Sequence, residues 1–344
     1  MTVSSTTALK PAVKIGRKFQ NPIETTVGGL AMMFKVLRLY LTDKGERVPR
    51  IPLGPFDTDV SIYDRPSSTG LRITWMGHSS MLVEIDGLRV LVDPVWDKRA
   101  SPVRWAGPKR FFDPPITLDQ LPTVDVVLVS HDHYDHLGKQ TIQRLSKAKP
   151  ACNARWITSL GVGKELESFG VPPERITELD WTQSSTIDGG LTITALPARH
   201  FSGRSLSRRF ETLWSSFALK TARHNIYFGA DSGRWDGFGD IAQEYGPFDL
   251  TMLEIGAYNE LWKSIHMGPE GAAESFADMG QAGLLMPIHW GLFDLALHAW
   301  NQPIKRMIEL ADQAGIKLWL PTPGLPTEVV RGEEHRSNWW KPSR

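Results

Sequence analysis

The sequence has little cysteine and almost no excess charge. Its one cysteine, Cys152, excludes an intrachain disulfide framework and any zinc site built from several thiolates. Lysine and arginine together number 39 and aspartate and glutamate 38, which gives a formal net charge of +1. Since a nearly neutral chain has no global field to attract a polyanion, we expect no nucleic-acid partner. Any metal in this protein must be held by histidine and carboxylate side chains.

Long hydrophobic runs are also missing. No segment approaches the roughly 20 apolar residues needed to span a membrane. The first 18 residues include four basic side chains but no apolar run of signal-peptide length. These absences predict a cytoplasmic protein, and any contact with a membrane is expected to be peripheral.

Apolar runs of strand length alternate with helical patterns along most of the chain. Asp86 and Gly87, between two such runs, predict a tight hairpin turn. Strands are expected near residues 71–76, 81–85, 89–92, 124–129, 155–159, 191–196, 213–220, 225–229, 249–254, 284–287 and 317–320. Helices are expected near residues 139–147, 163–168, 269–279 and 303–314. This order predicts an α/β fold in which helices cover the outer faces of two mixed sheets, in one domain over residues 61–344.

Residues 1–60 are expected to form an N-terminal extension that carries one short amphipathic helix. Within residues 30–41, five apolar side chains recur at three- and four-residue spacing and share one face. They are Leu30, Met33, Phe34, Leu37 and Leu41. The helix either docks on the domain or faces a membrane with Lys35 and Arg38 at its border, and the pattern fits both arrangements.

Three of the ten histidines fall within six residues, directly after the strand predicted for residues 124–129. In an extended chain, side chains two residues apart project to the same side, so His131 and His133 can bind one ion. Asp135 and His136 are then placed to bind a second ion. A solvated loop or a helix cap can carry such residues without a metal, but their spacing behind a strand favours a two-metal site.

The other ligands are expected further along the chain, each after a predicted strand. His200 follows residues 191–196, His289 follows residues 284–288, and Asp231 follows another apolar run. A carboxylate between two divalent ions can give one oxygen to each and hold them about 3.5 to 4 Å apart. The predicted partition places His131, His133 and His200 on one ion and Asp135, His136 and His289 on the other, with Asp231 and a hydroxide bridging them.

Several further segments carry a resemblance to a known family. They include Met76-Gly77-His78-Ser79-Ser80, Asp93-Pro94-Val95, Gly107-Pro108-Lys109-Arg110-Phe111, Ile255-Gly256-Ala257-Tyr258 and His266-Met267-Gly268-Pro269-Glu270. Together with the histidines and aspartates, they resemble the metallo-β-lactamase fold superfamily and, within it, the N-acylphosphatidylethanolamine-hydrolysing phospholipase D family. The resemblance runs from about residue 70 to about residue 330.

This resemblance implies an αββα sandwich, with zinc as the metal. It implies a binuclear metal-dependent phosphodiesterase of phospholipase D type, which acts on N-acylphosphatidylethanolamine-like lipids by attack of a metal-bridging hydroxide. His266 is expected near the reacting group of the substrate, and Asp135 is expected to orient the hydroxide as well as to bind metal. Asp135 and His266 are therefore the predicted catalytic residues.

Two other functions stay open at this point. The same pair of metals stabilises a tetrahedral oxyanion, which allows a lactonase of the sugar-phosphate lactonase type. A binding module that keeps the fold without catalysis is the other alternative. The expected partner is a small-molecule or phospholipid substrate, with membrane contact through residues 30–41 and a homodimer both left open.

The chain also departs from the family at a few positions. Asp132 stands where lipid-cleaving members carry asparagine, and Glu254 stands near an expected proline. His78 begins a strand hairpin, and a structural or supporting role beside the metals is favoured over a ligand role.

Overall fold

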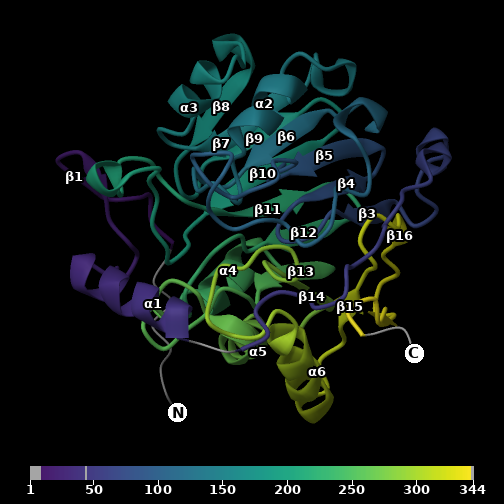
Figure 1. The fold of residues 1–344 in the computed structure, drawn as a ribbon. Coiled ribbons are helices and arrows are strands. Elements are labelled where there is room, and N and C mark those ends of the chain that lie inside the picture. The colour runs from purple at the N-terminus through teal and green to yellow at the C-terminus, as the bar shows by residue number, and fades with distance from the viewer. Residues whose placement is uncertain (1–8, 43–44, 342–344) are drawn as a thin grey trace, which may run out of the picture.

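The chain folds into two β-sheets that pack face to face between two layers of helices (Figure 1). A computed structural model describes residues 9–42 and 45–341 of the chain. The first sheet contains β3 (Leu71–Trp75), β4 (Met81–Ile85), β5 (Leu88–Val92), β6 (Val126–Val129), β7 (Arg155–Ser159), β8 (Ile176–Leu179) and β16 (Thr327–Glu328). Their order is β16-β3-β4-β5-β6-β7-β8, and the strands from β5 to β8 are parallel.

The second sheet has six strands. They are β9 (Ser184–Ile187), β10 (Leu191–Leu196), β11 (Ser216–Lys220), β12 (Asn225–Phe228), β13 (Leu250–Glu254) and β14 (Leu284–Ile288), in the order β14-β13-β12-β11-β10-β9. Both β10 and β12 are antiparallel to β11, and β12, β13 and β14 are parallel to one another. It follows that β10, β12, β13 and β14 all run in the same direction.

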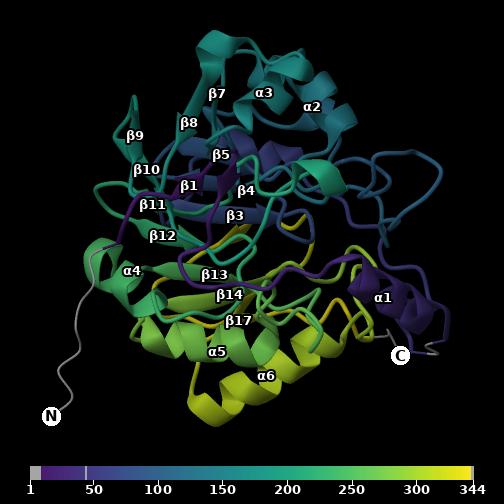
Figure 2. The ribbon, with the colours of Figure 1, turned by 90° about the vertical axis from the view of Figure 1, so that its left-hand side faces the viewer.

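Helices cover the outer face of each sheet. The first sheet carries α2 (Lys139–Leu145) and α3 (Gly163–Ser168), and the second carries α4 (Phe238–Tyr245), α5 (Gly268–Asp278) and α6 (Gln302–Ala314). Short 3₁₀ helices lie at Val60–Asp64, Leu118–Gln120, Lys149–Ala151, Pro173–Arg175 and Leu206–Arg208. Figure 2 shows α2 and α3 above the two sheets and α5 and α6 below them.

The N-terminal segment forms β1 (Lys14–Ile15), β2 (Lys18–Phe19) and α1 (Leu30–Thr42). Between β2 and α1 it runs across the front of the sandwich in Figure 2. Near the C-terminus, β15 (Trp319–Leu320) and β17 (His335–Arg336) pair in parallel. Within the described part of the chain, every helix is too short or too polar to cross a membrane.

The central strands, such as β3, β4, β6, β12, β13 and β14, are buried on both faces, which explains why they read as continuous apolar runs. Neighbouring residues of one strand point to opposite faces. Val83 packs between the sheets with Ile193 and Phe217, whereas Leu82 packs under the helices with Ile142. Because one core lies between the sheets and another lies beneath α2 and α3, the first sheet is held rigidly from both sides.

The predicted architecture of two mixed sheets between helical layers is confirmed, as is the hairpin turn at Asp86 and Gly87. Within the described residues, one helix, α4, and six strands were not predicted; the strands are β1, β2, β8, β9, β16 and β17. The strands β8 and β9 are only partly buried and contain polar residues between or before their apolar ones, so they lack an apolar run. The helix α4 buries only Phe238 and Ile241 and contains Gly239, which weakens its helical pattern.

The common direction of the strands positions the candidate site. The carboxyl ends of β5 and β6 lie at one edge of the first sheet, and those of β10, β12, β13 and β14 lie at one edge of the second. The predicted ligands occupy the segments that directly follow these strands. Residues separated by more than 150 positions in the sequence therefore meet at one end of the sandwich.

Candidate metal centre

Histidine and carboxylate side chains gather at this end of the sandwich. Within the described residues they form three groups whose potential ligand atoms lie within 4.8 Å of one another. The groups are His131, His133, His200 and Asp231; His78, Asp135, His136 and His289; and Asp231, Glu254, His266 and His289. The structure thus brings together all seven residues that the sequence analysis proposed as metal ligands.

In the first group, three imidazole nitrogens converge. His133 Nδ1 lies 2.9 Å from His131 Nε2 and 3.3 Å from His200 Nε2. The other ring nitrogens of His200 and His131 already have hydrogen-bond partners. His200 Nδ1 donates to the carbonyl of Ile265 at 2.9 Å, and His131 Nδ1 lies 2.9 Å from Ser130 Oγ. The inner nitrogens of His131 and His200 therefore present lone pairs to the same point, as imidazole ligands of a metal do.

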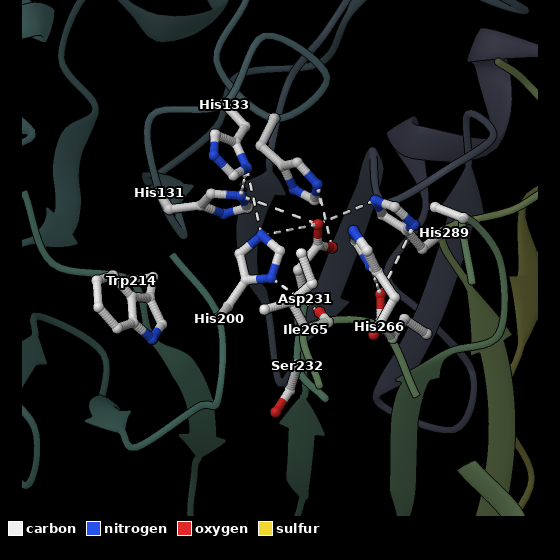
Figure 3. A network of polar contacts seen from close by, with 12 residues as sticks. His131, His133, His200, Trp214, Asp231, Ser232, Ile265, His266 and His289 are labelled. Carbon is white, nitrogen blue, oxygen red and sulfur yellow. Dashed lines mark hydrogen bonds and ion pairs between the residues drawn. The ribbon is translucent and has the colours of Figure 1, made fainter. Parts of the chain in front are cut away.

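The second group places nitrogen and oxygen atoms around the other side of Asp231. His289 Nε2 lies 3.1 Å from Asp231 Oδ2 and 3.3 Å from Asp135 Oδ2. His136 Nε2 lies 3.2 Å from Asp231 Oδ1. Figure 3 shows Asp231 between His131, His133 and His200 on one side and His266 and His289 on the other. A carboxylate in this position can bind an ion on each side.

Several of these buried atoms have no hydrogen-bond partner in the described structure. They are His136 Nε2, Asp231 Oδ1 and both ring nitrogens of His289. Buried polar atoms are normally paired, and a cluster of unpaired ones calls for a ligand. Imidazole nitrogen and carboxylate oxygen are the donors that zinc and other first-row divalent ions accept. The residues therefore fit a pair of divalent metal ions.

Asp93, directly after β5, supports both halves of the site although the sequence analysis gave it no role. Its Oδ2 accepts hydrogen bonds from His136 Nδ1 at 2.6 Å and from Ser130 Oγ at 2.7 Å, and its Oδ1 accepts from the Ser130 amide at 2.7 Å. Ser130 in turn contacts His131. One buried carboxylate thus fixes the ring of His136 directly and that of His131 through Ser130. In the sequence, the feature that could have indicated this role is the position of Asp93 directly after an apolar strand.

His78 supports Asp135. Its Nε2 lies 3.0 Å from Asp135 Oδ2, and its ring lies 3.9 Å from that of His289. Burial, together with the neighbouring His289, lowers the pKa of His78 to about 3. The ring is therefore neutral and can donate one N–H to the carboxylate of Asp135, which supports the expectation of a role beside the metals.

Asp132 lies between two predicted ligands but turns away from them. Its Oδ1 accepts from the Gly203 amide at 2.7 Å, and its Oδ2 accepts from Thr212 Oγ1 at 3.0 Å. These bonds tie the loop of His131 and His133 to the segment that follows β10. The carboxylate at this position therefore acts on loop structure rather than on a metal.

The backbone near the site adopts an uncommon conformation at several positions. The non-glycine residues with positive φ include His78, Asp93, Ala230, Ala257 and His289. Gly256 also permits a close approach, because a Cβ atom there would lie 2.0 Å from the carbonyl oxygen of His289. Such strain persists only where the surrounding structure enforces it, and it is concentrated at functional sites.

Without metal, the histidines of the two halves of the site differ in their pKa values. Burial lowers the pKa values of His131 and His200 well below the ordinary value. Burial also opposes a charge on His136 and His289, but nearby carboxylates, above all that of Asp231, outweigh it. The pKa of His136 is raised well above its ordinary value, and that of His289 is raised to about 10.

A pocket of about 330 Å³ leads to the metal residues. His133, Asp135, Asp231 and His289 line this pocket, as does His266. Its walls are largely apolar and include Val27, Val36, Trp262, Ile265 and Leu295. His266, expected near a reacting group, lies in the third group of ligand-type residues and on the pocket wall.

The N-terminal segment takes part in the site. Asn21 Oδ1 accepts from the backbone amide of His200 at 2.9 Å, and Asn21 Nδ2 donates to the backbone carbonyl of His200 at 2.8 Å. Arg199 donates to Thr25 Oγ1, and Ser264 donates to the carbonyl of Thr26. The segment that follows β2 is thus fixed to a predicted metal ligand and forms one wall of the pocket. Nothing in the sequence pattern indicated these contacts.

Comparisons with known proteins agree with the fold. The model of the beta-lactamase superfamily domain matches residues 88–290. An uncharacterised protein of Mycobacterium tuberculosis is 46% identical over 283 residues, which cover 82% of this chain and 74% of that protein. The N-acyl-phosphatidylethanolamine-hydrolyzing phospholipase D 1 of Caenorhabditis elegans is 34% identical over 316 residues, which cover 87% of this chain and 88% of that protein.

Solved structures share the fold at low sequence identity. The isothiocyanate hydrolase from Delia radicum gut bacteria aligns with a TM-score of 0.60 at 18% identity, over 76% of this chain and 100% of that chain. Igni18, a metallo hydrolase from Ignicoccus hospitalis, aligns with a TM-score of 0.57 at 19% identity, over 75% of this chain and 97% of that chain.

The contacts of Asn21 predict an effect on metal binding. Replacing Asn21 with alanine leaves both backbone groups of His200 without their partner, and we expect the affinity for the ion on His131, His133 and His200 to fall about tenfold. Competition with a chromophoric chelator measures this affinity. The matched control is Gln20→Ala, since Gln20 bonds only to the carbonyl of Lys18 through its side chain. Equal affinities for the two variants would contradict the assigned role.

The charge division predicts that metal binding depends on pH unequally in the two halves. At pH 7.5, raised pKa values keep His136 and His289 protonated in the metal-free protein, and each must lose a proton to bind an ion. His131 and His200 are already neutral. Titration calorimetry with zinc in buffers of different ionisation enthalpy should therefore detect more protons released with one ion than with the other, and weaker binding of the proton-linked ion as pH falls. Equal proton release for both ions would argue against this division.

Proposed function

Because the chain belongs to the metallo-β-lactamase fold superfamily and, within it, to the N-acylphosphatidylethanolamine-hydrolysing phospholipase D family, we propose that this metal-dependent hydrolase is a binuclear phosphodiesterase of phospholipase D type. Its substrate would be an N-acylphosphatidylethanolamine-like lipid. The observation that carries the proposal is the likeness to the Caenorhabditis elegans phospholipase, which extends over most of both chains. The apolar pocket above the metal residues supports it.

The donor set is suited to zinc. His131, His133 and His200 would hold one ion and Asp135, His136 and His289 the other, with Asp231 shared between them. Bound there, two divalent ions would supply a hydroxide nucleophile at neutral pH and stabilise negative charge on a phosphate group. Asp93 and His78 keep the ligand side chains in place for these ions.

The pocket walls account for a lipid substrate. Val27, Val36 and Leu295 offer an apolar surface to an acyl chain. Among the described residues that line the pocket, Arg209 alone carries a permanent positive charge, and it is fixed by a hydrogen bond to the carbonyl of Gly28 at 2.8 Å. We assign Arg209 to the anionic phosphodiester, since a guanidinium binds phosphate oxygens well.

His266 is assigned to the leaving oxygen. Hydrolysis consumes one water, whose oxygen bonds to phosphorus, while the bond from phosphorus to the ethanolamine oxygen breaks. The electron pair stays on the ethanolamine oxygen, which then needs a proton. His266 lies on the pocket wall and can deliver that proton as a general acid, then regain one from the water that was consumed.

The helix α1 offers a route for a lipid to reach the pocket. Its side chains Phe34 and Leu41 are 67% and 79% exposed, and Lys35 and Arg38 are also exposed. Val36 of the same helix lines the pocket. The side chains of Leu30, Met33 and Leu37 lie outside the described part of the structure. We propose that α1 contacts the membrane surface, with its exposed apolar side chains in the lipid and its basic residues at the headgroups.

The function is tested with purified, zinc-loaded protein and N-acylphosphatidylethanolamine in mixed micelles. We expect phosphatidic acid and N-acylethanolamine as products, and we expect Asp231→Asn to lower kcat by more than about 100-fold. The exposed Asp236→Asn is the matched control and should retain the activity of the unmodified protein. A panel of simple lactones is assayed in parallel. Hydrolysis of lactones without hydrolysis of the phosphodiester would favour a lactonase, and inactivity towards both would favour a binding module.

A further inference from the structure

Glu254 lies at the carboxyl end of β13, beside the metal residues, and the reaction outlined above leaves it without a task. We infer that Glu254 is a positioning residue for His266, which it holds in the ring orientation and tautomer that present Nε2 to the leaving oxygen. This inference rests on the proposed phosphodiesterase function. It adds a second residue to the delivery of the proton.

The contacts of Glu254 are short and specific. Its Oε2 lies 2.7 Å from His266 Nδ1, and its Oε1 accepts the backbone amide of Met267 at 2.9 Å. The carboxylate is fully buried, with 0% of the residue exposed. Each oxygen thus has its own donor, and the two donors belong to consecutive residues. The carboxylate fixes the side chain of His266 and the backbone that follows it at the same time.

The rings of His200 and His289 lie beside that of His266, with centroids 5.0 and 5.3 Å away, but ring contacts do not decide which nitrogen carries the proton. His266 follows a segment without regular secondary structure between β13 and α5. It lines the metal pocket on one side and, on the other, an outer cleft of about 770 Å³ that also contains Lys263 and Arg306. The ring therefore borders both spaces. Within the described structure, the hydrogen bond to Glu254 is the one that holds the ring.

The chemistry of a carboxylate also decides the tautomer. An ionised carboxylate only accepts hydrogen bonds, so the Nδ1 atom that faces Glu254 carries a proton. The other ring nitrogen, Nε2, is then the atom left for the substrate. While the ring holds the proton for the leaving oxygen it is positively charged, and the adjacent carboxylate balances that charge in a buried place.

Glu254 also approaches a predicted metal ligand, but less closely. Its Oε2 lies 3.7 Å from His289 Nδ1, against 2.7 Å from His266 Nδ1. The longer separation exceeds a hydrogen bond. A role through His289 would appear as a change in metal binding, whereas a role through His266 would appear in the step that protonates the leaving group. The two roles are therefore separable by experiment.

The substitution Glu254→Gln tests the positioning role with little change in shape. An amide has one acceptor oxygen and one donor NH₂ group, so it cannot accept from both His266 and Met267. If its oxygen stays with Met267, its NH₂ group faces Nδ1 and reverses the tautomer of His266. The matched control is Glu260→Gln in the neighbouring loop, since Glu260 is exposed and contacts only Lys263, at 3.4 Å.

The kinetic readout compares two leaving groups on the zinc-loaded proteins. N-acylphosphatidylethanolamine releases an alkoxide that needs a proton, whereas bis(p-nitrophenyl) phosphate releases a phenolate that is stable without one. We expect Glu254→Gln to lower kcat for the lipid by about 100-fold at unchanged KM. For the aryl diester, kcat should fall by no more than about tenfold. His266→Asn should show the same difference between substrates. A similar fall for both substrates, or a loss of zinc, would overturn the inference.

A spectroscopic readout separates this inference from the proposed function. In protein labelled with ¹⁵N at histidine, the Nδ1 proton of His266 should give a strongly downfield resonance that disappears in Glu254→Gln and in His266→Asn but persists in Glu260→Gln. Its absence from the unmodified protein would overturn the inference whatever the substrate is. If the unmodified protein hydrolyses neither phosphodiester, the proposed function fails. The presence or absence of this resonance then still shows whether Glu254 is hydrogen-bonded to His266 Nδ1.

Discussion

The convergence of histidine nitrogens on the buried carboxylate of Asp231 is the constraint on which the site depends. Imidazole nitrogens of His136 and His289 lie 3.2 and 3.1 Å from its two oxygens. Within the described residues, His136 Nε2, His289 Nε2 and Asp231 Oδ1 have no hydrogen-bond partner, which is costly in a protein interior. Divalent ions on both sides of the carboxylate would bind His136 Nε2, His289 Nε2 and the oxygens of Asp231. The composition of the site therefore supports the proposed two-ion centre.

The fold supplies the rigidity that such a cluster needs. Strands of both sheets end at the same edge, and the core between the sheets and the core beneath α2 and α3 hold them there. Supporting side chains then act on individual ligands, as Asp93 does on His136 and Asn21 on His200. The backbone strain at Asp93 and His289 lies within this framework. The predicted ligands are thus held in place by contacts within the protein.

The part of this structure that the sequence could predict is the part recorded in local patterns. The predicted ligands could be found because each follows an apolar strand, and parallel strand ends meet at one edge. Asn21, Asp93 and Glu254 were harder to predict because their roles depend on partners far away in the sequence: Asn21 contacts a residue 179 positions later. The polar strands β8 and β9 were missed for a related reason, since pairing with neighbours rather than apolar content defines them.

The metal positions test the account most directly. Crystals of zinc-loaded protein, measured at the zinc absorption edge, should give two anomalous peaks about 3.5 to 4 Å apart with the carboxylate of Asp231 between them. One peak should lie about 2.0 to 2.2 Å from nitrogens of His131, His133 and His200, and the other should contact His136 and His289. A single peak, or two peaks of which one has no contact with Asp231, would contradict the bridging role on which this account is built.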